Sequence, residues 1–411
     1  MNTNLAIQQQ YVRTQLRRIT IAVIALCAVW LIFSIRPVHA AQAGDTVTYN
    51  NNIIATYTNS NTVTYHPSED SNQNYKWLNY LLSKSGKLTI NIPSGSDFHI
   101  NGPLIPTSNK TINATGSTIT MKPNTYVMMT NPTKAIKNLT IKGGTWRSPD
   151  DGGRKGSMFQ FAFASNITLD GIDVNANFSG HSIEIIACSN VTIKNCTVRA
   201  IGSNPKNCKE EQIQIDVSTK ATAPKVAAYG AKYVKGQTCK NIKIINNTVY
   251  GARAIGVNYH ASCPSKYHKN IVIKNNVLHS TTSEAIQFFN VINGTISGNK
   301  IRTDATRKTD NASYTIAVHI QNNGKAPAAM KSSVITVKNN LIYGNRNGIY
   351  VKGYSTSGRF GKVKVTKNTV YCKKGKANCI DQTRGSCRSF KVTANKKHKW
   401  TKSTDIQVNL A

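Results

Sequence analysis

A short β-type unit recurs along the chain from Lys87 onward, and it constrains the fold more than any other feature of the sequence. Each copy enters through Asn, alternates aliphatic with polar residues and ends in Asn or Gly, as in Asn190-Val-Thr-Ile-Lys-Asn195 and Asn270-Ile-Val-Ile-Lys-Asn-Asn276. Most copies begin 23 to 29 residues after the previous one. Self-similarity at such a period indicates a solenoid, because one coil cannot bury its apolar face until others stack on it.

Each unit continues with a second apolar pair and then a third strand, so a coil contains three short strands. The expected third strands span residues 181–186, 211–217, 253–259, 284–289, 314–320, 347–352 and 378–383. Asn and Gly supply left-handed backbone at the corners. The pattern predicts an all-β domain over residues 67–395, a single-stranded parallel β-helix of about ten coils. Ser68 to Leu82 is expected to form a short amphipathic helix that caps its N-terminal end.

The repeat resembles a known one. The rhythm Asn190-Val-Thr-Ile-Lys-Asn-Cys-Thr-Val198 is similar to the right-handed β-helix repeat of the pectate-lyase-like superfamily. The segments Lys87-Leu-Thr-Ile-Asn-Ile-Pro-Ser-Gly95 and Ile112-Asn-Ala-Thr-Gly-Ser-Thr-Ile119 look like the first coils of that superfamily. The resemblance covers roughly residues 66–395 and implies a right-handed β-helix. It leaves the chemistry open, because this fold hosts lyases, hydrolases, epimerases and non-catalytic adhesins.

The two ends of the chain differ from the repeats. Arg13, Arg17 and Arg18 precede an apolar run over residues 19–35, and small residues follow up to Ala40. This arrangement predicts a secretory signal peptide over residues 1–40, with an uncleaved membrane anchor as the alternative, so an exported protein is expected in either case. Residues 41–66, rich in Asn and Thr, are expected to form an exposed leader segment, and residues 396–411 a basic tail or cap.

Charge and cysteine usage narrow the partners and the compartment. Lys and Arg total 52 against 17 Asp and Glu, a formal net charge of +35. Such a surface attracts polyanions, here an acidic polysaccharide or an anionic cell wall, whereas nothing beyond charge supports nucleic acid. A membrane partner is expected only if the leader is uncleaved. Eight of the nine cysteines follow the leader and are compatible with disulfides, and Cys208 and Cys239 could staple one loop. Cys188 and Cys196, within strand patterns, are expected to be buried thiols.

Stacking the third strands predicts a ligand groove. An inward ladder is expected at Ile183, Ile213, Ile255, Ile286 and Ile349. One outward row then holds Glu184, Gln214, Gly256, Gln287, Ala317 and Tyr350. A second row holds Ile186, Asp216, Asn258, Phe289, His319 and Lys352, with His260 just beyond. A mixture of acids, amides, His, Tyr and Lys is typical of a binding face, although packing or hydrogen bonding is the alternative for any single His or Tyr.

The acids on this sheet indicate the chemistry. Glu184 and Asp216 are expected on neighbouring strands, about 8 Å apart, from the strand spacing and a two-residue offset. That separation lies within the roughly 6.5–9.5 Å of an inverting glycosidase. A lyase would instead need a cation and a base, which Arg253, Lys352, His260, His319, Tyr259 or Tyr350 could supply. The catalytic candidates are Glu184, Asp216, His319 and Lys352.

Polygalacturonase-type motifs are only partly echoed. The paired aspartates of polygalacturonase-type hydrolases are replaced here by Glu210-Glu211-Gln212-Ile213, and their Gly-His-Gly motif is similar to Gly180-His181-Ser182-Ile183. In this chain the His segment precedes the acidic segment, whereas in those hydrolases it follows. Their Arg-Ile-Lys motif is missing. Strand parity places His181 and Glu211 at corners, facing inward or sideways, so they are expected outside the site. No cofactor is expected, and calcium could bind only through Asp216 and Glu184, without the usual acidic cluster.

Substrate binding is expected from both the sheet and a loop. The residues are Gln214, Asn258, His260, Gln287, Arg253, Tyr350, Lys232 and Tyr233. Lys232 and Tyr233 belong to a loop over residues 218–238, whose Lys and Tyr suit a sugar polyanion. A solvated insertion is the alternative. The sequence thus predicts an exported protein that acts on a uronic-acid polysaccharide as a lyase or hydrolase. The alternative is a non-catalytic surface protein that binds anionic cell-wall polymers or host glycans.

Overall fold

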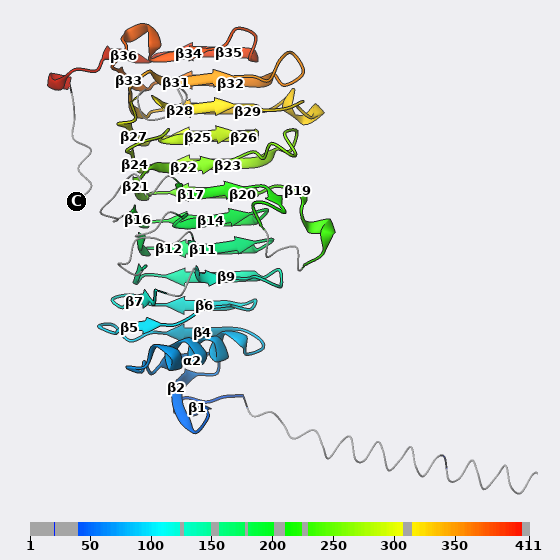
Figure 1. The fold of residues 1–411 in the computed structure, drawn as a ribbon, viewed down its shortest axis with the longest axis vertical. Helices are drawn as coiled ribbons and strands as arrows, with labels where there is room; N and C mark the ends of the chain where they lie inside the picture. Colours follow the sequence, from blue (N-terminus) through cyan, green and yellow to red (C-terminus); the bar gives the residue numbers. More distant parts are fainter. Residues whose placement is uncertain are drawn as a thin grey trace, which may run out of the picture.

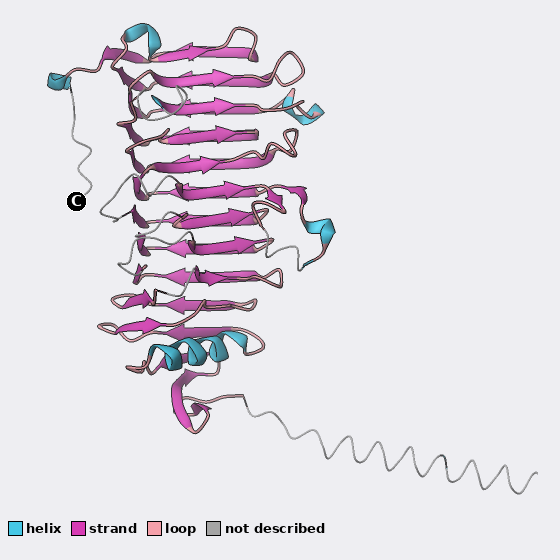
Figure 2. Ribbon diagram, in the orientation of Figure 1, coloured by secondary structure: helices cyan, strands magenta, loops and turns pink. Residues whose placement is uncertain are grey.

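The chain forms a parallel β-helix whose coils stack along one axis (Figures 1 and 2). The computed structural model describes residue 20 and residues 40–123, 127–148, 156–176, 180–200, 210–223, 229–306 and 315–404. Three strands to a coil build three long sheets, here named sheets A, B and C, and the predicted fold is confirmed. The predicted signal peptide lies outside the described residues except for Thr20 and Ala40. No helix among the described residues is long and apolar enough to cross a bilayer.

Sheet A contains the first strand of each coil. Its strands, in spatial order, are β1 (Thr46–Tyr49), β2 (Asn52–Asn59), β3 (Thr62–Tyr65), β4 (Leu88–Asn91), β6 (Lys110–Asn113), β9 (Lys137–Lys142), β12 (Ser165–Asp170), β15 (Ser189–Lys194), β20 (Lys240–Ile245), β23 (His268–Lys274), β26 (Val291–Ser297), β29 (Val334–Lys338), β32 (Phe360–Thr366) and β35 (Cys387–Thr393). From β3 onward all of these neighbours pair in parallel, as stacked coils require.

Sheets B and C contain the second and third strands. Sheet B consists of β5 (Asp97–Ile100), β7 (Thr118–Met121), β10 (Thr145–Arg147), β13 (Asp173–Ala176), β16 (Thr197–Ala200), β21 (Thr248–Gly251), β24 (Val277–Ser280), β27 (Lys300–Thr303), β30 (Leu341–Gly344), β33 (Thr369–Cys372) and β36 (Lys396–Lys399). Sheet C consists of β8 (Val127–Thr130), β11 (Ser157–Ala162), β14 (Ile183–Ile186), β17 (Glu211–Asp216), β22 (Arg253–Val257), β25 (Ile286–Phe289), β28 (Ile316–Gln321), β31 (Asn347–Lys352) and β34 (Ile380–Gln382).

Short elements complete the described chain. The strands β18 (Ser218–Thr219) and β19 (Lys235–Gln237) form an antiparallel pair within the insertion after β17. Four single-turn 3₁₀ helices are η2 (Ala231–Tyr233), η4 (Ala328–Met330), η5 (Lys376–Asn378) and η6 (Lys402–Thr404). They lie in connections and leave the three sheets intact.

Asparagines hold the corner between sheets A and B. A buried column follows this corner, in which each Nδ2 donates to the Oδ1 of the next member at 2.9 Å. Its members are Asn247, Asn276, Asn299, Asn340, Asn368 and Asn395. The residues just before several of them, such as Asn246 and Asn275, have φ values of 58° and 55°. Asn tolerates this left-handed region better than most residues, which explains why the repeat ends in Asn-Asn.

The core is a set of aliphatic ladders inside the coils. In sheet C the predicted inward ladder is confirmed, with Val318 as an additional member, and all of its members are fully buried. The helix α2 (Ser71–Ser83) covers the N-terminal end of this core (Figure 2). Asp70 caps it by accepting a hydrogen bond from the Asn72 amide at 2.8 Å. Trp77, Leu78 and Leu81 are buried beneath it, so the predicted cap helix is confirmed.

Residues 46–65 differ from the expected exposed segment. They form β1, β2 and β3, of which β3 pairs in parallel with β4 and extends sheet A. Ile54, Val63 and Tyr65 are fully buried, and Tyr65 donates a hydrogen bond to Asn74 of α2 at 2.7 Å. The alternation of apolar residues is short here, and the many Asn and Thr residues around it made the segment look exposed in the sequence. At the other end, β36 joins sheet B and the buried Trp400 packs on Tyr343.

The cysteines do not form disulfides among the described residues. Cys188 and Cys196 are buried thiols, as predicted. Cys239 is also free and buried, and its thiol donates to the Ile185 carbonyl at 3.4 Å. The expected disulfide between Cys208 and Cys239 is therefore wrong, because Cys239 is a free thiol. Cys208 itself lies outside the described residues.

Candidate active site

The outer face of sheet C carries the row of polar side chains that the repeat predicts. In register, the row reads Glu184, Gln214, Gly256, Gln287, His319 and Tyr350. His319 thus takes the place expected for Ala317, and Gln321 takes the place expected for His319 between Phe289 and Lys352. The two-residue error arose in β28, where aliphatic residues at 316, 318 and 320 allow more than one register.

Glu184 and Asp216 lie on neighbouring strands, as expected. Asp216 pairs with Ile186, so Glu184 is one strand away and offset by two residues. The Oε2 atom of Glu184 accepts hydrogen bonds from Ser157 Oγ at 2.9 Å and Gln160 Nε2 at 2.6 Å. These two donors orient the carboxylate, which is only 5% exposed.

Asp216 has an unusual protonation equilibrium. Its side chain is 3% exposed, and burial raises the pKa of Asp216 to about 7. The Val217 amide donates to its Oδ1 at 2.6 Å and opposes the rise, whereas repulsion from Glu184 and Glu211 adds to it. Asp216 therefore holds a proton near neutral pH while it lies beside other carboxylates.

A column of alternating charge runs along the start of four third strands. It consists of His181, Glu211, Arg253 and Glu284, each two residues before an inward Ile. Arg253 donates from Nη1 to Glu211, and its Nη2 lies 2.9 Å from Glu284 Oε2. His181 Nδ1 lies 3.0 Å from the Glu211 carbonyl oxygen and 3.5 Å from its carboxylate. All four side chains are largely buried, so each charge is neutralised by its neighbours.

The column shifts the pKa values of its members. Burial alone would raise the pKa of Glu211, but Arg253 and His181 outweigh it and lower the pKa. In Glu284, hydrogen bonding to His319 and attraction to Arg253 likewise outweigh burial and lower the pKa. Burial lowers the pKa of His181, but attraction to Glu211 and Glu184 exceeds this effect and raises it. The ionised acids thus contrast with protonated Asp216.

Glu211 and His181, expected at corners outside the site, lie close enough to Asp216 for their charges to affect its pKa. A Cβ at Gly256, in the outward row, would lie 2.4 Å from Glu211 Cγ. The absence of a side chain at Gly256 therefore lets Glu211 turn onto the outer face, although its strand parity is inward. The sequence did carry a signal, since charged or ionisable residues with alternating sign occupy the same position in four successive coils.

His319 and Lys352 do not share a centre with Asp216. His319 Nδ1 lies 3.2 Å from Glu284 Oε1, and its ring packs edge-on against Phe289 with centroids 4.9 Å apart. Its Nε2 is buried without a hydrogen-bond partner. Lys352 is exposed on β31, four strands from Asp216, a distance of about 19 Å at the usual strand spacing. Glu184 and Asp216 are thus the catalytic candidates that the structure brings together.

The expected substrate-binding residues fall into two groups. Gln214 lies between Glu184 and Gly256 with its Oε1 buried and unpartnered. Others contact each other or the surrounding sheet. Gln287 donates to Asn258, His260 Nδ1 lies 2.7 Å from Ser262 Oγ, and the hydroxyls of Tyr350 and Thr383 are 2.8 Å apart. Arg253 is engaged by two carboxylates, as described above.

The insertion after β17 is packed rather than merely solvated. Tyr233 lies edge-on to Phe163 with centroids 5.2 Å apart and contacts Tyr229 at 5.5 Å. Tyr229 donates to the Asn131 carbonyl at 2.7 Å. Lys232 is exposed at the tip of this cluster. The aromatic rings therefore anchor the insertion, whereas Lys220, Lys232 and Lys235 are exposed.

One group of side chains has the spacing of metal ligands. The ligand atoms of His181, Glu210 and Glu211 lie within 4.8 Å of one another. Arg253 already neutralises the Glu211 carboxylate, and His181 Nδ1 contacts the Glu211 carbonyl. A cation here would face a buried guanidinium, so these residues do not fit a metal well. We assign none.

The comparisons with known proteins agree with the fold. No protein-family model and no curated protein sequence matches the chain. Among solved structures, it is similar to endo-xylogalacturonan hydrolase from Aspergillus tubingensis, with a TM-score of 0.51 and 11% identity over 83% of this chain and 93% of that one. The chain is therefore a right-handed parallel β-helix protein, and the sequence resemblance to pectate-lyase-like repeats is confirmed at the level of fold.

Two further structures are similar with lower scores. The surface adhesin PfbA of Streptococcus pneumoniae matches with a TM-score of 0.49 and 15% identity over 80% of this chain and 89% of that one. The tailspike protein of E. coli bacteriophage HK620, solved with a pentasaccharide, matches with a TM-score of 0.48 and 14% identity over 90% of this chain and 69% of that one.

Proposed function

We propose that the chain cleaves an acidic polysaccharide along the outer face of sheet C, with Asp216 as the proton donor and Glu184 as the base. One observation carries the proposal. Asp216 holds its proton up to about pH 7, directly beside carboxylates on the same face. Two acids whose environments separate their protonation states are what acid–base cleavage of a glycosidic bond requires.

The arrangement suits an inverting hydrolase. One strand spacing and a two-residue offset separate the carboxyl groups by about 8 Å, which leaves room for a water molecule between base and sugar. Ser157 and Gln160 hold Oε2 of Glu184, while its Oε1 makes no hydrogen bond to the described residues. That oxygen can therefore accept a proton from the attacking water. Asp216 delivers its proton to the departing glycosidic oxygen.

The acidic character of the substrate is supported by charge. The chain carries a formal net charge of +35, which draws a polyanion to its surface. Lys352 and Lys232 are exposed cations on β31 and in the insertion after β17. A similar structure is that of an endo-xylogalacturonan hydrolase. Action outside the cell follows from the expected secretory leader.

Lyase chemistry has less support from the geometry. Elimination needs a cation that neutralises the uronate carboxylate before a base removes the neighbouring proton. Arg253, the buried cation of this face, already binds Glu211 and Glu284. Removing it from that column would leave two buried carboxylates without their guanidinium partner. Hydrolysis needs only Asp216 and Glu184 and leaves the ion pairs of Arg253 intact.

A non-catalytic binding protein is the second candidate. One observation favours it: the charged side chains of the column pair with each other. Arg253 pairs with Glu284, and Glu284 pairs with His319. Such a network can stabilise a sheet without touching a ligand. In that case the outer face of sheet C would hold a sugar chain without cleaving it.

One assay separates these functions. The exported domain is incubated with polygalacturonate, alginate, hyaluronan and chondroitin while reducing ends and unsaturated-uronide absorbance are followed. We expect reducing ends to increase without the absorbance. An increase in both signals would identify a lyase, and binding without either would identify the non-catalytic protein.

A matched pair of variants ties the activity to the site. Asp216→Asn is compared with Asp381→Asn. Asp381 lies on β34 of the same sheet and accepts a hydrogen bond from the next backbone amide at 2.8 Å, just as Asp216 does. We expect turnover to be lost in the first variant and kept in the second.

A further inference from the structure

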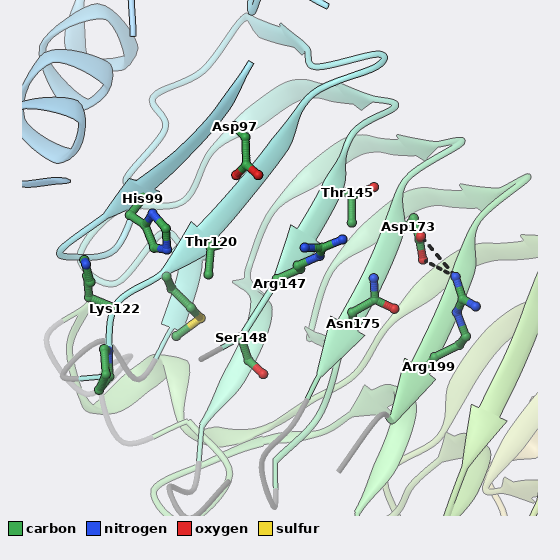
Figure 3. A pocket seen from close by; sticks show the side chains of 12 residues that line it. Asp97, His99, Thr120, Lys122, Thr145, Arg147, Ser148, Asp173, Asn175 and Arg199 are labelled. Atoms are coloured by element: carbon green, nitrogen blue, oxygen red, sulfur yellow. Dashed lines mark hydrogen bonds and ion pairs between the residues drawn. The ribbon is translucent and has the colours of Figure 1, made fainter. Parts of the chain in front are cut away.

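A second polar surface lies on sheet B, away from the candidate active site. The outer faces of β5, β7, β10, β13 and β16 border a hollow of about 690 Å³ (Figure 3). These strands belong to the N-terminal half of the solenoid. The hollow is lined by polar and charged side chains that the sequence patterns did not single out.

Strand register aligns five of these side chains in one row. The row reads His99, Thr120, Arg147, Asn175 and Arg199. Their neighbours in sequence point inward and are buried: Phe98, Ile119, Trp146, Val174 and Val198. Successive members of the row are therefore about one strand spacing, ~4.8 Å, apart. Figure 3 shows the side chains of Arg147 and Asn175 directed into the hollow.

Most of this row has unused hydrogen-bonding capacity. Among the described residues, the side chains of His99, Thr120, Arg147 and Asn175 make no hydrogen bond or ion pair. Arg199 is held in place by Asp173, with Nη2 at 3.3 and 3.1 Å from the two carboxylate oxygens (Figure 3). Its Nε is buried and has no partner. The polar groups thus face the hollow and leave their donors for something outside the protein.

The C-terminal half of the same row behaves differently. There the row continues through Tyr250, His279, Arg302, Tyr343, Tyr371 and His398. His279 and Arg302 share Asp304, at 2.7 and 2.8 Å. Tyr371 stacks on Tyr343 and on His398, with centroids 4.7 and 4.8 Å apart. Contacts within the protein thus engage the C-terminal half of the row, whereas most side chains of the N-terminal half have no partner among the described residues.

We propose that the hollow binds a short acidic oligosaccharide through the carboxylates of its uronate units. Arg147 offers a planar guanidinium that no carboxylate of the described residues occupies, and such a fork matches a carboxylate in two parallel hydrogen bonds. Lys122 adds a second cation at the lining, and Asn175 supplies donors and an acceptor for sugar hydroxyls. The row of polar groups follows the direction in which an extended sugar chain would lie.

The lining favours a sugar over a nucleic acid. Asp97 and Asp173 lie at the hollow and would repel a densely charged phosphate backbone, but they can accept hydrogen bonds from sugar hydroxyls. His99 is the aromatic residue of the lining, whereas single-stranded nucleic acids are held by several stacking rings. The proposal rests on sheet B alone and holds whether or not sheet C cleaves a sugar.

Calorimetry with an oligogalacturonide tests the binding. All proteins carry Glu184→Gln so that the probe is not consumed, and the fully methyl-esterified probe serves as the uncharged comparison. We expect Arg147→Gln to weaken one binding event about tenfold or more, because it removes charge-assisted hydrogen bonds. Arg388→Gln removes an equal charge from an exposed site on β35 of sheet A and should leave that event unchanged. Equal affinities in both variants would overturn the proposal, as would equal binding of the ester.

Carbodiimide coupling locates the bound sugar. The reagent joins a probe carboxylate to a nearby lysine amine as an amide, with loss of water to the carbodiimide. We expect the half-buried Lys122 to be labelled ahead of the exposed lysines, with the label lost in Arg147→Gln and kept in Arg388→Gln. Labelling confined to Lys352, on β31 of sheet C, would assign the binding to sheet C and refute a site on sheet B.

Discussion

Arg253 binds Glu284, which lies two residues before the next strand of sheet C, with Nη2 2.9 Å from Oε2, and both side chains are almost completely buried. On its other side Arg253 binds Glu211. The guanidinium therefore neutralises two carboxylates that have lost contact with water. This pairing links three successive coils beside the candidate active site.

Removing Arg253 should destabilise the protein strongly. Arg253→Met keeps much of the side-chain volume but leaves the buried Glu211 and Glu284 with only their histidine contacts, which we expect to lower the free energy of unfolding by about 3–5 kcal/mol. The matched control is Arg199→Met, whose ion pair with Asp173 is 38% and 31% exposed. Its loss should cost about 1 kcal/mol or less. Urea denaturation measures both, and equal losses would contradict the stabilising role of Arg253.

The activity on the polysaccharide should decrease as Asp216 loses its proton. Because burial raises the pKa of Asp216 to about 7, the proton donor is present below that pH and is depleted above it. The pH profile of kcat/KM for the cleaved polymer should therefore decline with a midpoint near pH 7. A profile that stays level to pH 9 would show that Asp216 is not the donor.

Asp216 should also make stability depend on pH. Its pKa is about 7 in the folded chain but about 3.9 when an aspartate is unfolded, so the folded state binds more protons between these values. The stabilisation is complete below about pH 4 and is lost as pH rises through about 7. We expect the urea midpoint of the native protein, relative to that of Asp216→Asn, to decrease over this range. A constant difference would mean that the carboxyl titrates normally.

The buried asparagine column should contribute strongly to stability. Asn276 donates to Asn299 Oδ1 and to the Ile244 carbonyl, both at 2.9 Å, and it accepts from the Asn247 side chain. Asn276→Ala leaves these groups buried and unpaired, so we expect a loss of about 3 kcal/mol or more. Thermal or urea unfolding of the variant provides the measurement.

The control for the asparagine column is an exposed corner. Asn270 has a φ of 57° and donates only to Asn241, at 2.8 Å. Asn270→Ala should cost about 1 kcal/mol, because alanine lacks the short polar side chain that helps Asn adopt left-handed backbone. Asn270→Gly should recover most of that loss. Equal costs at positions 270 and 276 would show that corner conformation matters more than the buried hydrogen bonds.

The sequence alone determined the solenoid, its period, its corner asparagines and the inward ladder of sheet C. It could do so because every second side chain of a strand points into the core, and because this alternation recurs in each coil of the repeat. The adjacency of Glu184 and Asp216 followed from the same rule. These features depend on the spacing of residues along the chain, which can be read from the sequence.

The tertiary structure alone decided where the column of His181, Glu211, Arg253 and Glu284 points. Alternation predicts an inward side chain for Glu211, but the bare backbone of Gly256 in the next coil opens the path to the outer face. The register of β28 was likewise ambiguous, because Ile316, Val318 and Ile320 are all suitable for the core. The protonation of Asp216 depends on neighbours from other coils, and so does the position of the Arg147 guanidinium, which no carboxylate of the described residues occupies. Such contacts join residues far apart in the sequence, and no local pattern records them.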